Sequence, residues 1–237
     1  MWLIAEYESV TLFSLKQSSA TASGGKTLLV PTPYAVKMAL LDVACRALGV
    51  DEAKQRWPEI RDLIIAIRPA SGVVVTNLFQ KVLKPYKNPP KLGTPDFGPF
   101  QRTIGYREYA QLIGPLGIAV GWESADSNAW IADLMLNVSY LGKRGGFMQM
   151  LAPPVTADEL PPGFMNATSN PNQFAINGTL QVLDDCAPDL SFDKVNIYSG
   201  EKVKMGKDRI TRQIVVPYRL KRSSKSFSWY ELIEETP

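Results

Sequence analysis

The chain has 237 residues, 45% of them hydrophobic and 21% charged, and a net charge of +3. This length suits one large domain or two small ones that share a core, and no apolar run approaches the roughly 18 residues that span a bilayer. The sequence contains no histidine, which excludes imidazole-based triads and histidine-containing zinc sites. A carboxylate-only metal site would still be possible, but the acids show no paired spacing of the Asp-x-Asp type. We therefore expect a protein without a metal or cofactor and without a membrane partner.

The N-terminus and the two cysteines indicate the cytoplasm. Met1 to Glu6 lack the basic start and the long apolar core of a signal peptide. Cys45 and Cys186 are too few for a disulfide framework and lack the spacing of a metal site.

Local patterns in the first third of the chain predict strands and one clear helix. Thr32 is placed as an N-cap, Pro33 suits the first helical position, and Gly49 is typical of the residue that closes a helix. Between them, apolar residues recur at helical spacing. β-forming residues predict strands at residues 2–13, 61–67 and 72–78.

A basic, proline-rich stretch from Lys81 to Arg102 follows and predicts a long inserted loop, bounded at residues 79–103. Loops of this length inside a compact domain are usually functional or disordered. Beyond it, β-type runs at 103–109 and 112–122 precede a helix at about 127–140 and a strand that begins at Phe147.

The first part of the chain thus runs strand, helix, strand, strand, helix, strand. This order indicates an α+β, ferredoxin-like (βαββαβ) fold of the type that RNA-recognition modules use. We place this domain at residues 1–152 and a β-rich extension packed on it at residues 153–237, because a proline-rich break follows residue 152. β-type runs in the extension lie at 173–182, 194–198 and 210–220.

The segment Leu-Gly-Lys-Arg-Gly-Gly-Phe joins the second predicted helix to the next strand. Gly142, Gly145 and Gly146 carry no Cβ, so the backbone can approach a ligand closely. Lys143 with Arg144 indicates that this ligand is an anion, and a phosphate backbone fits. Glycine and cations are also ordinary at helix C-termini, and the loop taken alone favours that interpretation.

Cations and acids are segregated along the chain. Basic residues dominate from Lys81 to Arg107 and again from Lys202 to Lys225, whereas acids gather elsewhere. Such segregation is expected of a polyanion binder, although a basic run is more often a solvated face. When the glycine loop is considered with the two basic runs, nucleic-acid binding and a merely solvated surface are equally favoured interpretations. The basic candidates outside the loop are Lys26, Lys81, Lys84, Arg102, Arg107, Lys204, Lys207 and Arg209.

Three local motifs carry a resemblance to a known family. They are Leu29 to Lys37 (LVPTPYAVK) with the small-residue helix after it, Gly105 to Tyr109 (GYREY) before a Gly-Pro-containing strand, and Leu141 to Gly146 (LGKRGG). With these motifs in this order, the chain resembles the repeat-associated (RAMP) superfamily of CRISPR systems. Within it, the chain is most similar to the CRISPR-associated protein 5 family. The motifs cover the first two thirds of the chain.

The resemblance implies an RRM-like, ferredoxin-like fold with a glycine-rich loop after the second helix. It also implies a non-catalytic subunit of a type I Cascade surveillance complex, which binds and caps the 5′ handle of crRNA and helps to organise target DNA recognition. The implied partners are crRNA, backbone subunits of the protein 7 type, a large subunit of the protein 8 type and target DNA.

The implied RNA contacts fall on the glycine loop, one strand and the insertion. Lys143 and Arg144 would meet phosphates, and Arg107 would place a charge beside Tyr106 and Tyr109 as stacking rings. Aromatic residues near strand ends are, however, more often packing residues. The insertion has the length of a thumb that reaches the guide-RNA path of the next subunit.

Two alternatives stay open. Some members of the family process precursor RNA at a site that commonly includes histidine, which this chain lacks. A metal-independent endoribonuclease would therefore need a tyrosine or a lysine as its base. The other alternative is a structural subunit of an unrelated assembly that contains no nucleic acid.

Overall fold

The computed structural model describes residues 1–17, 25–88, 90–95, 97–122, 129–143, 145–169 and 177–233. The helices are α1 (Pro33–Ala47), α2 (Val50–Gln55), α3 (Trp57–Arg61), α4 (Ala129–Leu136) and α5 (Phe192–Val195). The strands are β1 (Trp2–Ser9), β2 (Ile64–Arg68), β3 (Gly72–Pro85), β4 (Phe100–Ile113), β5 (Leu116–Gly121), β6 (Met148–Met150), β7 (Val155–Ala157), β8 (Met165–Asn166), β9 (Thr179–Cys186), β10 (Arg209–Val216), β11 (Tyr218–Ser223) and β12 (Phe227–Leu232).

The central sheet confirms the ferredoxin-like prediction. Its strand order is β6-β1-β5-β2-β8, and β1 pairs antiparallel with both β5 and β6 while β2 pairs antiparallel with β5. When the β3–β4 hairpin is set aside, the elements run β1-α1-β2-β5-α4-β6 along the chain. Each strand–helix–strand unit is thus split by a strand of the other unit, which is the split βαβ arrangement.

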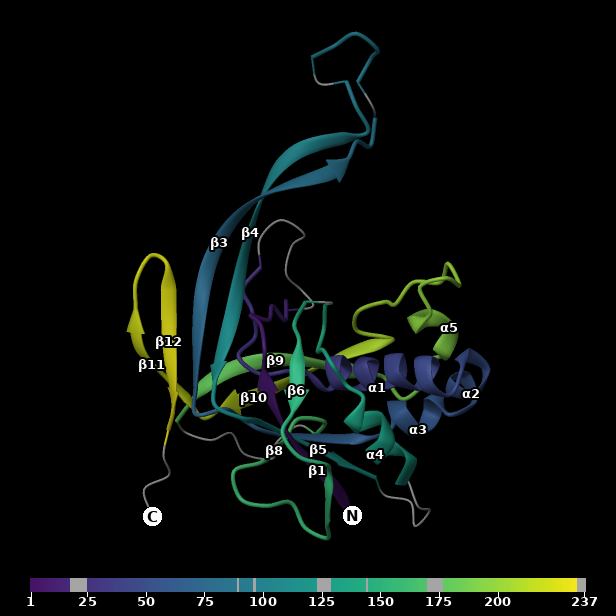
Figure 1. Ribbon diagram of the computed structural model, residues 1–237, viewed down its shortest axis with the longest axis vertical. Coiled ribbons are helices and arrows are strands. Elements are labelled where there is room, and N and C mark those ends of the chain that lie inside the picture. Colours follow the sequence, from purple (N-terminus) through teal and green to yellow (C-terminus); the bar gives the residue numbers. More distant parts are fainter. Residues whose placement is uncertain are drawn as a thin grey trace.

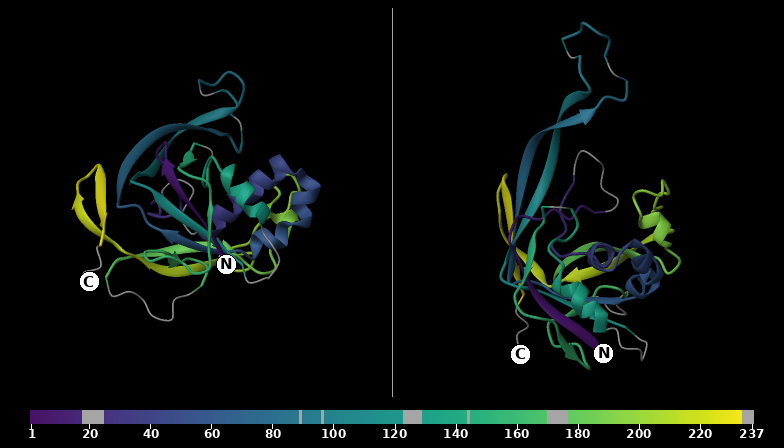
Figure 2. Two further views of the ribbon diagram at one scale, coloured as in Figure 1. Left: turned by 60° about the horizontal axis from the view of Figure 1, so that its bottom comes forward. Right: turned by 45° about the vertical axis from the view of Figure 1, so that its right-hand side comes forward.

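Helices α1 and α4 pack on the same face of this sheet, and the hydrophobic core lies between them and β1 and β5 (Figures 1 and 2). The Tyr7 hydroxyl on β1 donates a hydrogen bond to the carbonyl oxygen of Met135 on α4 at 2.9 Å. As predicted, Thr32 caps α1, because its Oγ1 accepts from the Ala35 N–H at 3.0 Å. Gly49, with φ at +90°, follows the last turn. No helix in the described ranges is long and apolar enough to span a membrane.

The inserted segment is a two-stranded arm, so the prediction of a loop from Lys81 to Arg102 was wrong. Strands β3 and β4 pair along their whole length, from Gly72 opposite Ile113 to Pro85 opposite Phe100. They rise out of the body and end in a connection over residues 86–99 (Figures 1 and 2). The prolines mark the ends of the strands, where the missing N–H breaks no ladder. Pro85 is the last residue of β3, and Pro99 precedes β4.

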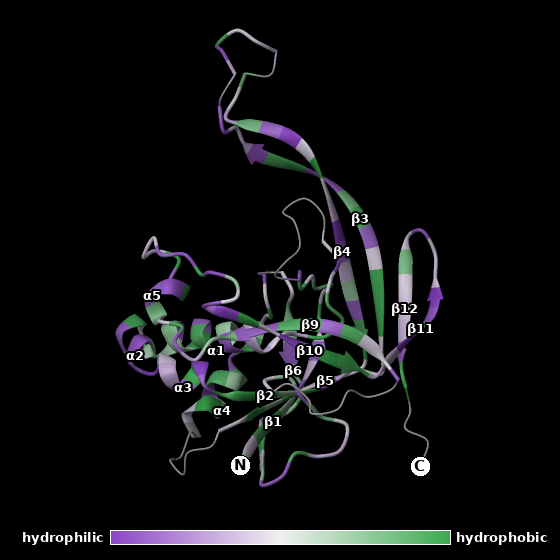
Figure 3. Ribbon diagram, turned by 180° about the vertical axis from the view of Figure 1, so that it is seen from behind, coloured by the Kyte–Doolittle hydropathy of each residue, from purple (hydrophilic) through white to green (hydrophobic). Residues whose placement is uncertain are grey.

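The arm belongs to a second sheet, with the order β11-β12-β3-β4. Strand β12, from the C-terminal end of the chain, pairs antiparallel with the base of β3. Short polar and apolar patches follow one another along the arm (Figure 3), so both of its faces carry residues of both kinds. The strand predicted at 112–122 is divided, because Gly114 turns the chain with φ at +81° between β4 and β5.

The chain after residue 152 is spread over both sheets and α1. Strands β7 and β8 extend the central sheet, β9 pairs with β10 beside α1, and β11 and β12 join the arm sheet. The strand predicted at 194–198 is wrong, because Phe192 is buried and the Asn196 N–H bonds its carbonyl in the single turn of α5. The run at 210–220 is two strands separated at Pro217. The domain boundary stays a prediction.

Candidate nucleic-acid interface

The glycine loop is a turn of its own and not the end of a helix. Helix α4 already ends at Leu136, short of the predicted 140, and Tyr140 bridges Phe147 across the loop. The Leu141 N–H donates to the Gly146 carbonyl oxygen at 3.1 Å, and the Gly146 N–H donates to the Lys143 carbonyl at 3.1 Å. The helix C-cap interpretation is therefore wrong. Arg144 lies outside the described residues.

Backbone conformation requires glycine at two positions of the loop, and close packing adds a second requirement at one of them. Gly142 and Gly145 have φ values of +74° and +107°, in the left-handed region that L side chains rarely adopt. A Cβ on Gly142 would also lie 2.5 Å from Leu15 Cδ2, whereas a Cβ on Gly145 would meet nothing within 4 Å. The loop thus packs closely against Leu15 at Gly142, whereas the space beside Gly145 is open.

This difference predicts unequal effects of alanine on stability. Gly145→Ala bears only the backbone strain and is expected to lower the free energy of unfolding by about 1–2 kcal/mol. Gly142→Ala adds the clash with Leu15, and we expect a loss of about 2–4 kcal/mol. Urea unfolding followed by far-ultraviolet circular dichroism measures both. Equal losses would show that Leu15 does not support the loop.

A first pocket lies between the glycine loop and the base of the arm. Its volume is about 310 Å³, and its lining includes Ser14, Arg107, Tyr109, Lys143, Gly145 and Gly146. Burial lowers the pKa of the Lys143 ammonium, and the nearby charges of Arg107 and Lys16 lower it further. Three cations thus converge at one edge of the loop, and a bound anion would relieve their mutual repulsion.

A second pocket, of about 370 Å³, adjoins the other side of Lys143. Its lining includes Lys16, Tyr34, Gly142, Lys143, Asp184 and Arg209. The Arg209 guanidinium carbon lies 4.0 Å from the centroid of the Tyr34 ring, and its Nε donates to the Asp184 carboxylate. Burial raises the pKa of Tyr34 to about 12, so its hydroxyl stays protonated at neutral pH. The stack presents a fixed planar cation beside the loop.

The predicted trio of Arg107, Tyr106 and Tyr109 is divided by the strand that carries it. Arg107 and Tyr109 line the first pocket, whereas Tyr106, on the opposite face of β4, packs against Phe79 with ring centroids 5.0 Å apart. The Tyr109 hydroxyl donates to Gln80 Oε1 at 3.3 Å. The Glu108 carboxylate, next to Arg107 in the chain, accepts from the Thr27 N–H at 3.0 Å.

The remaining predicted cations lie apart from the two pockets. On the arm, Lys81 and Arg102 share the face of Tyr106, whereas Lys84 points to the other face. Lys26 is exposed beside Thr27. Lys204 and Lys207 are exposed in the turn around Asp208, whose carboxylate accepts from the Lys204 N–H at 2.8 Å.

The C-terminal basic run is not one uniform cationic face. Arg209 is paired with Asp184, and Lys221 with Glu231. Asp208, which is fully buried, holds Lys194 at 2.5 Å. Sequence reasoning missed Lys16 and Tyr34. Only the motif LVPTPYAVK, which contains Tyr34, offered a signal for either of them.

Comparison with known proteins gives similarity of structure alone. No family model matches the chain, and no curated protein matches it. A chain of a CRISPR RNA-guided surveillance complex is 14% identical, with a TM-score of 0.48, over 98% of this chain and 89% of that one. A CRISPR protein from Archaeoglobus fulgidus is 10% identical, with a TM-score of 0.45, over 98% and 92%. A chain of the type III-B Cmr-beta complex bound to cognate target RNA is 14% identical, with a TM-score of 0.43, over 70% and 62%. The function is therefore inferred from this chain's own residues.

Proposed function

We propose that this protein binds single-stranded RNA along the glycine loop and caps the 5′ handle of crRNA as a non-catalytic subunit of a type I CRISPR surveillance complex. The observation that carries the proposal is the position of Lys143 between two adjoining pockets. Four cations and two tyrosine rings from distant parts of the chain meet there, namely Lys16, Arg107, Lys143, Arg209, Tyr34 and Tyr109.

The arrangement suits a single strand better than a duplex. Proteins hold single-stranded RNA by cations along its phosphates and by planar side chains against its unstacked bases. Lys16, Lys143 and Arg107 supply the first element, and the Arg209–Tyr34 stack supplies the second. Because Asp184 fixes the guanidinium, little side-chain entropy is lost when a base stacks on it. In the family that the sequence resembles, such a strand is the 5′ handle of crRNA, and we extend that assignment to this chain.

The arm fits the role of a thumb in such a complex. Phe79, Leu83 and Ile104 share one face with Lys81 and Arg102, and these apolar side chains are 71%, 65% and 64% exposed. Exposed apolar residues beside cations suit a neighbouring backbone subunit and the guide strand that it carries. A large subunit of the protein 8 type and target DNA complete the proposed assembly.

The RNA-binding proposal is tested with the purified protein and a fluorescent single-stranded RNA of the repeat-derived 5′ tag. We expect binding at low salt, with log affinity falling against log salt by about 0.7 per neutralised phosphate. A duplex of the same sequence should bind more weakly. Protein that purifies without nucleic acid and ignores RNA at low salt would instead favour a structural subunit of another assembly.

One observation favours the endoribonuclease alternative. The pKa of Lys143 is lowered, and a lysine that acts as a base at neutral pH needs a shift in this direction. We nevertheless expect repeat RNA to stay intact when it is incubated with the protein in EDTA across neutral and mildly alkaline pH. A discrete cut that disappears in Lys143→Ala would replace the non-catalytic proposal.

A further inference from the structure

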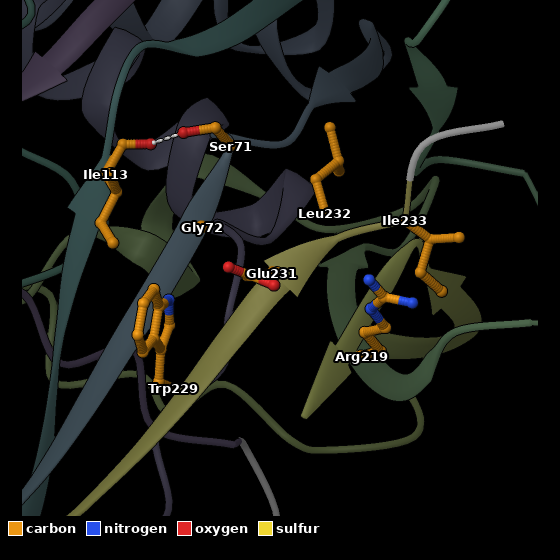
Figure 4. A pocket seen from close by; sticks show the side chains of 8 residues that line it. All are labelled: Ser71, Gly72, Ile113, Arg219, Trp229, Glu231, Leu232 and Ile233. Atoms are coloured by element: carbon orange, nitrogen blue, oxygen red, sulfur yellow. Dashed lines mark hydrogen bonds between the residues drawn. The ribbon is translucent and has the colours of Figure 1, made fainter. Parts of the chain in front are cut away.

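A third pocket lies on the arm sheet, where Gly72 and Ile113 form the ends of β3 and β4 away from the tip of the arm. Figure 4 shows the side chains that line it. Its volume is about 600 Å³, within the range of about 300–1,000 Å³ typical of small-molecule sites. It shares no lining residue with the two pockets at the glycine loop. The lining that matters here comprises Gly72, Ile113, Arg219, Trp229, Glu231 and Ile233.

One residue in the row that lines this pocket carries no side chain. Arg219, Glu231, Gly72 and Ile113 are successive cross-strand partners on β11, β12, β3 and β4, so their side chains share one face of the sheet. Gly72 contributes no side chain to this row. A Cβ there would lie 3.0 Å from the Tyr230 carbonyl oxygen, 3.4 Å from Ile113 Cδ1 and 3.6 Å from Trp229 Nε1, so the position has no room for a side chain. Ile113 and the Trp229 indole are the apolar walls of the pocket on either side of the Gly72 backbone (Figure 4).

The polar groups of this pocket are only partly used within the described residues. Glu231 accepts from Lys221 through Oε1, and no described residue bonds its Oε2. Arg219 forms no ion pair with any described acid. The Lys221 ammonium lies 4.4 Å from the centroid of the Trp229 ring, which keeps the indole in place. A flat aromatic wall, one carboxylate oxygen and one guanidinium, the last two without a partner among the described residues, therefore line the pocket.

We propose that this pocket binds one unstacked nucleotide whose base carries an exocyclic amino group. The base stacks on Trp229, its amino group donates to Glu231 Oε2, and its phosphate pairs with Arg219. Uracil has no such amine, and the carbonyl oxygens that flank its N3–H repel a carboxylate. The pocket is thus a second nucleotide site, separate from the glycine loop and independent of whether that loop caps a guide RNA.

The indole N–H of Trp229 gives a direct readout, because it lies at the pocket floor with no acceptor among the described residues. In ¹H–¹⁵N spectra of the labelled protein, Trp229→Phe identifies its signal among the five tryptophans. We expect millimolar CMP and AMP to shift this signal and UMP to shift it at least about fivefold less at the same concentration. Absence of a shift with every nucleotide, or equal shifts with CMP and UMP, would overturn the proposal.

Two matched variants separate base contact from hairpin packing. Glu231→Gln keeps the shape but loses the charge, and we expect about fivefold weaker CMP binding. Lys221→Arg keeps a cation over the indole and beside Glu231 but reshapes the ion pair, so CMP binding should persist. Equal weakening in both variants would mean that only hairpin packing matters and would refute the base contact. Lys143→Ala should bind CMP at this pocket as the unaltered protein does, whatever happens to RNA binding at the loop.

Discussion

Replacing Lys143 and Arg107 together by alanine is expected to lower the affinity for the single-stranded 5′ tag by about 10- to 100-fold at low salt. Both side chains line the same pocket, and each is placed to make a charge-assisted bond to phosphate. The salt dependence should also become shallower, by about 0.7 for each phosphate contact that is lost. Fluorescence anisotropy over a salt series measures both quantities.

A control variant with the same change in net charge makes this result specific. Arg46→Ala with Lys54→Ala removes two cations whose side chains are 52% and 53% exposed and which pair with Asp42 and Asp193. These residues lie outside both pockets at the glycine loop. We expect their loss to change RNA affinity by less than about twofold. If the control weakens binding as much as the pocket variant, the RNA follows overall charge and the proposed site is wrong.

The order of the ferredoxin-like elements could be predicted because its signals are local. Helix α1 begins where Thr32 and Pro33 indicate, and its cap bond joins residues three apart. The sheet order then follows from the βαββαβ succession, since few topologies bury such a set of elements. The boundaries were less accurate. Strand β1 ends at Ser9, and only an isolated bridge from Phe13 to Ala110 continues beyond it.

The arm and its sheet could not be predicted from local signals. Strand β3 pairs with β4 across a connection of 14 residues, and β12 reaches β3 from the far end of the chain. Strand propensity carries no information about such distant pairing partners. The prolines of the connection also made the sequence on either side of it look unlike a strand. The position of Tyr106, in contrast, could have been predicted from the sequence. Once residues 103–109 are taken as a strand, period-two alternation already separates it from Arg107 and Tyr109.

The candidate site was predicted in part. Lys143 and Arg107, which the sequence offered as separate candidates for RNA contact, line one pocket. The Arg209–Tyr34 stack was not foreseen as a unit, because it depends on β9 and β10 packing beside α1. Asp184 on β9 holds the guanidinium in place, and the neighbouring residue Asp185 fixes β9 to the helix. The site therefore depends on a buried ion pair that no local pattern indicates.

Replacing Lys37 by methionine is expected to lower the free energy of unfolding by about 3–5 kcal/mol. The Lys37 ammonium on α1 lies 2.7 Å from the Asp185 carboxylate on β9, and both side chains are 2% exposed. Without the lysine, a buried carboxylate stays uncompensated. Urea unfolding measures the loss, and Lys54→Ala, which breaks an exposed pair, should cost less than about 1 kcal/mol. Similar losses in the two variants would mean that burial does not make the Lys37 pair special.

The pH dependence of the Lys37→Met deficit identifies its cause. Burial already raises the pKa of Asp185, and the charge of Lys37 is the main effect that opposes the rise. In the variant the folded state holds a proton on Asp185 that the unfolded chain releases, so protonation stabilises the fold. The deficit relative to the unaltered protein should therefore narrow as the pH falls toward the ordinary pKa of aspartate.

Because Asp184 is next to Asp185 in the chain and orients Arg209, the RNA affinity of Lys37→Met should also fall, although Lys37 lines neither pocket at the glycine loop. A destabilised variant with full RNA affinity would show that the Arg209–Tyr34 stack does not need β9 to be fixed to α1.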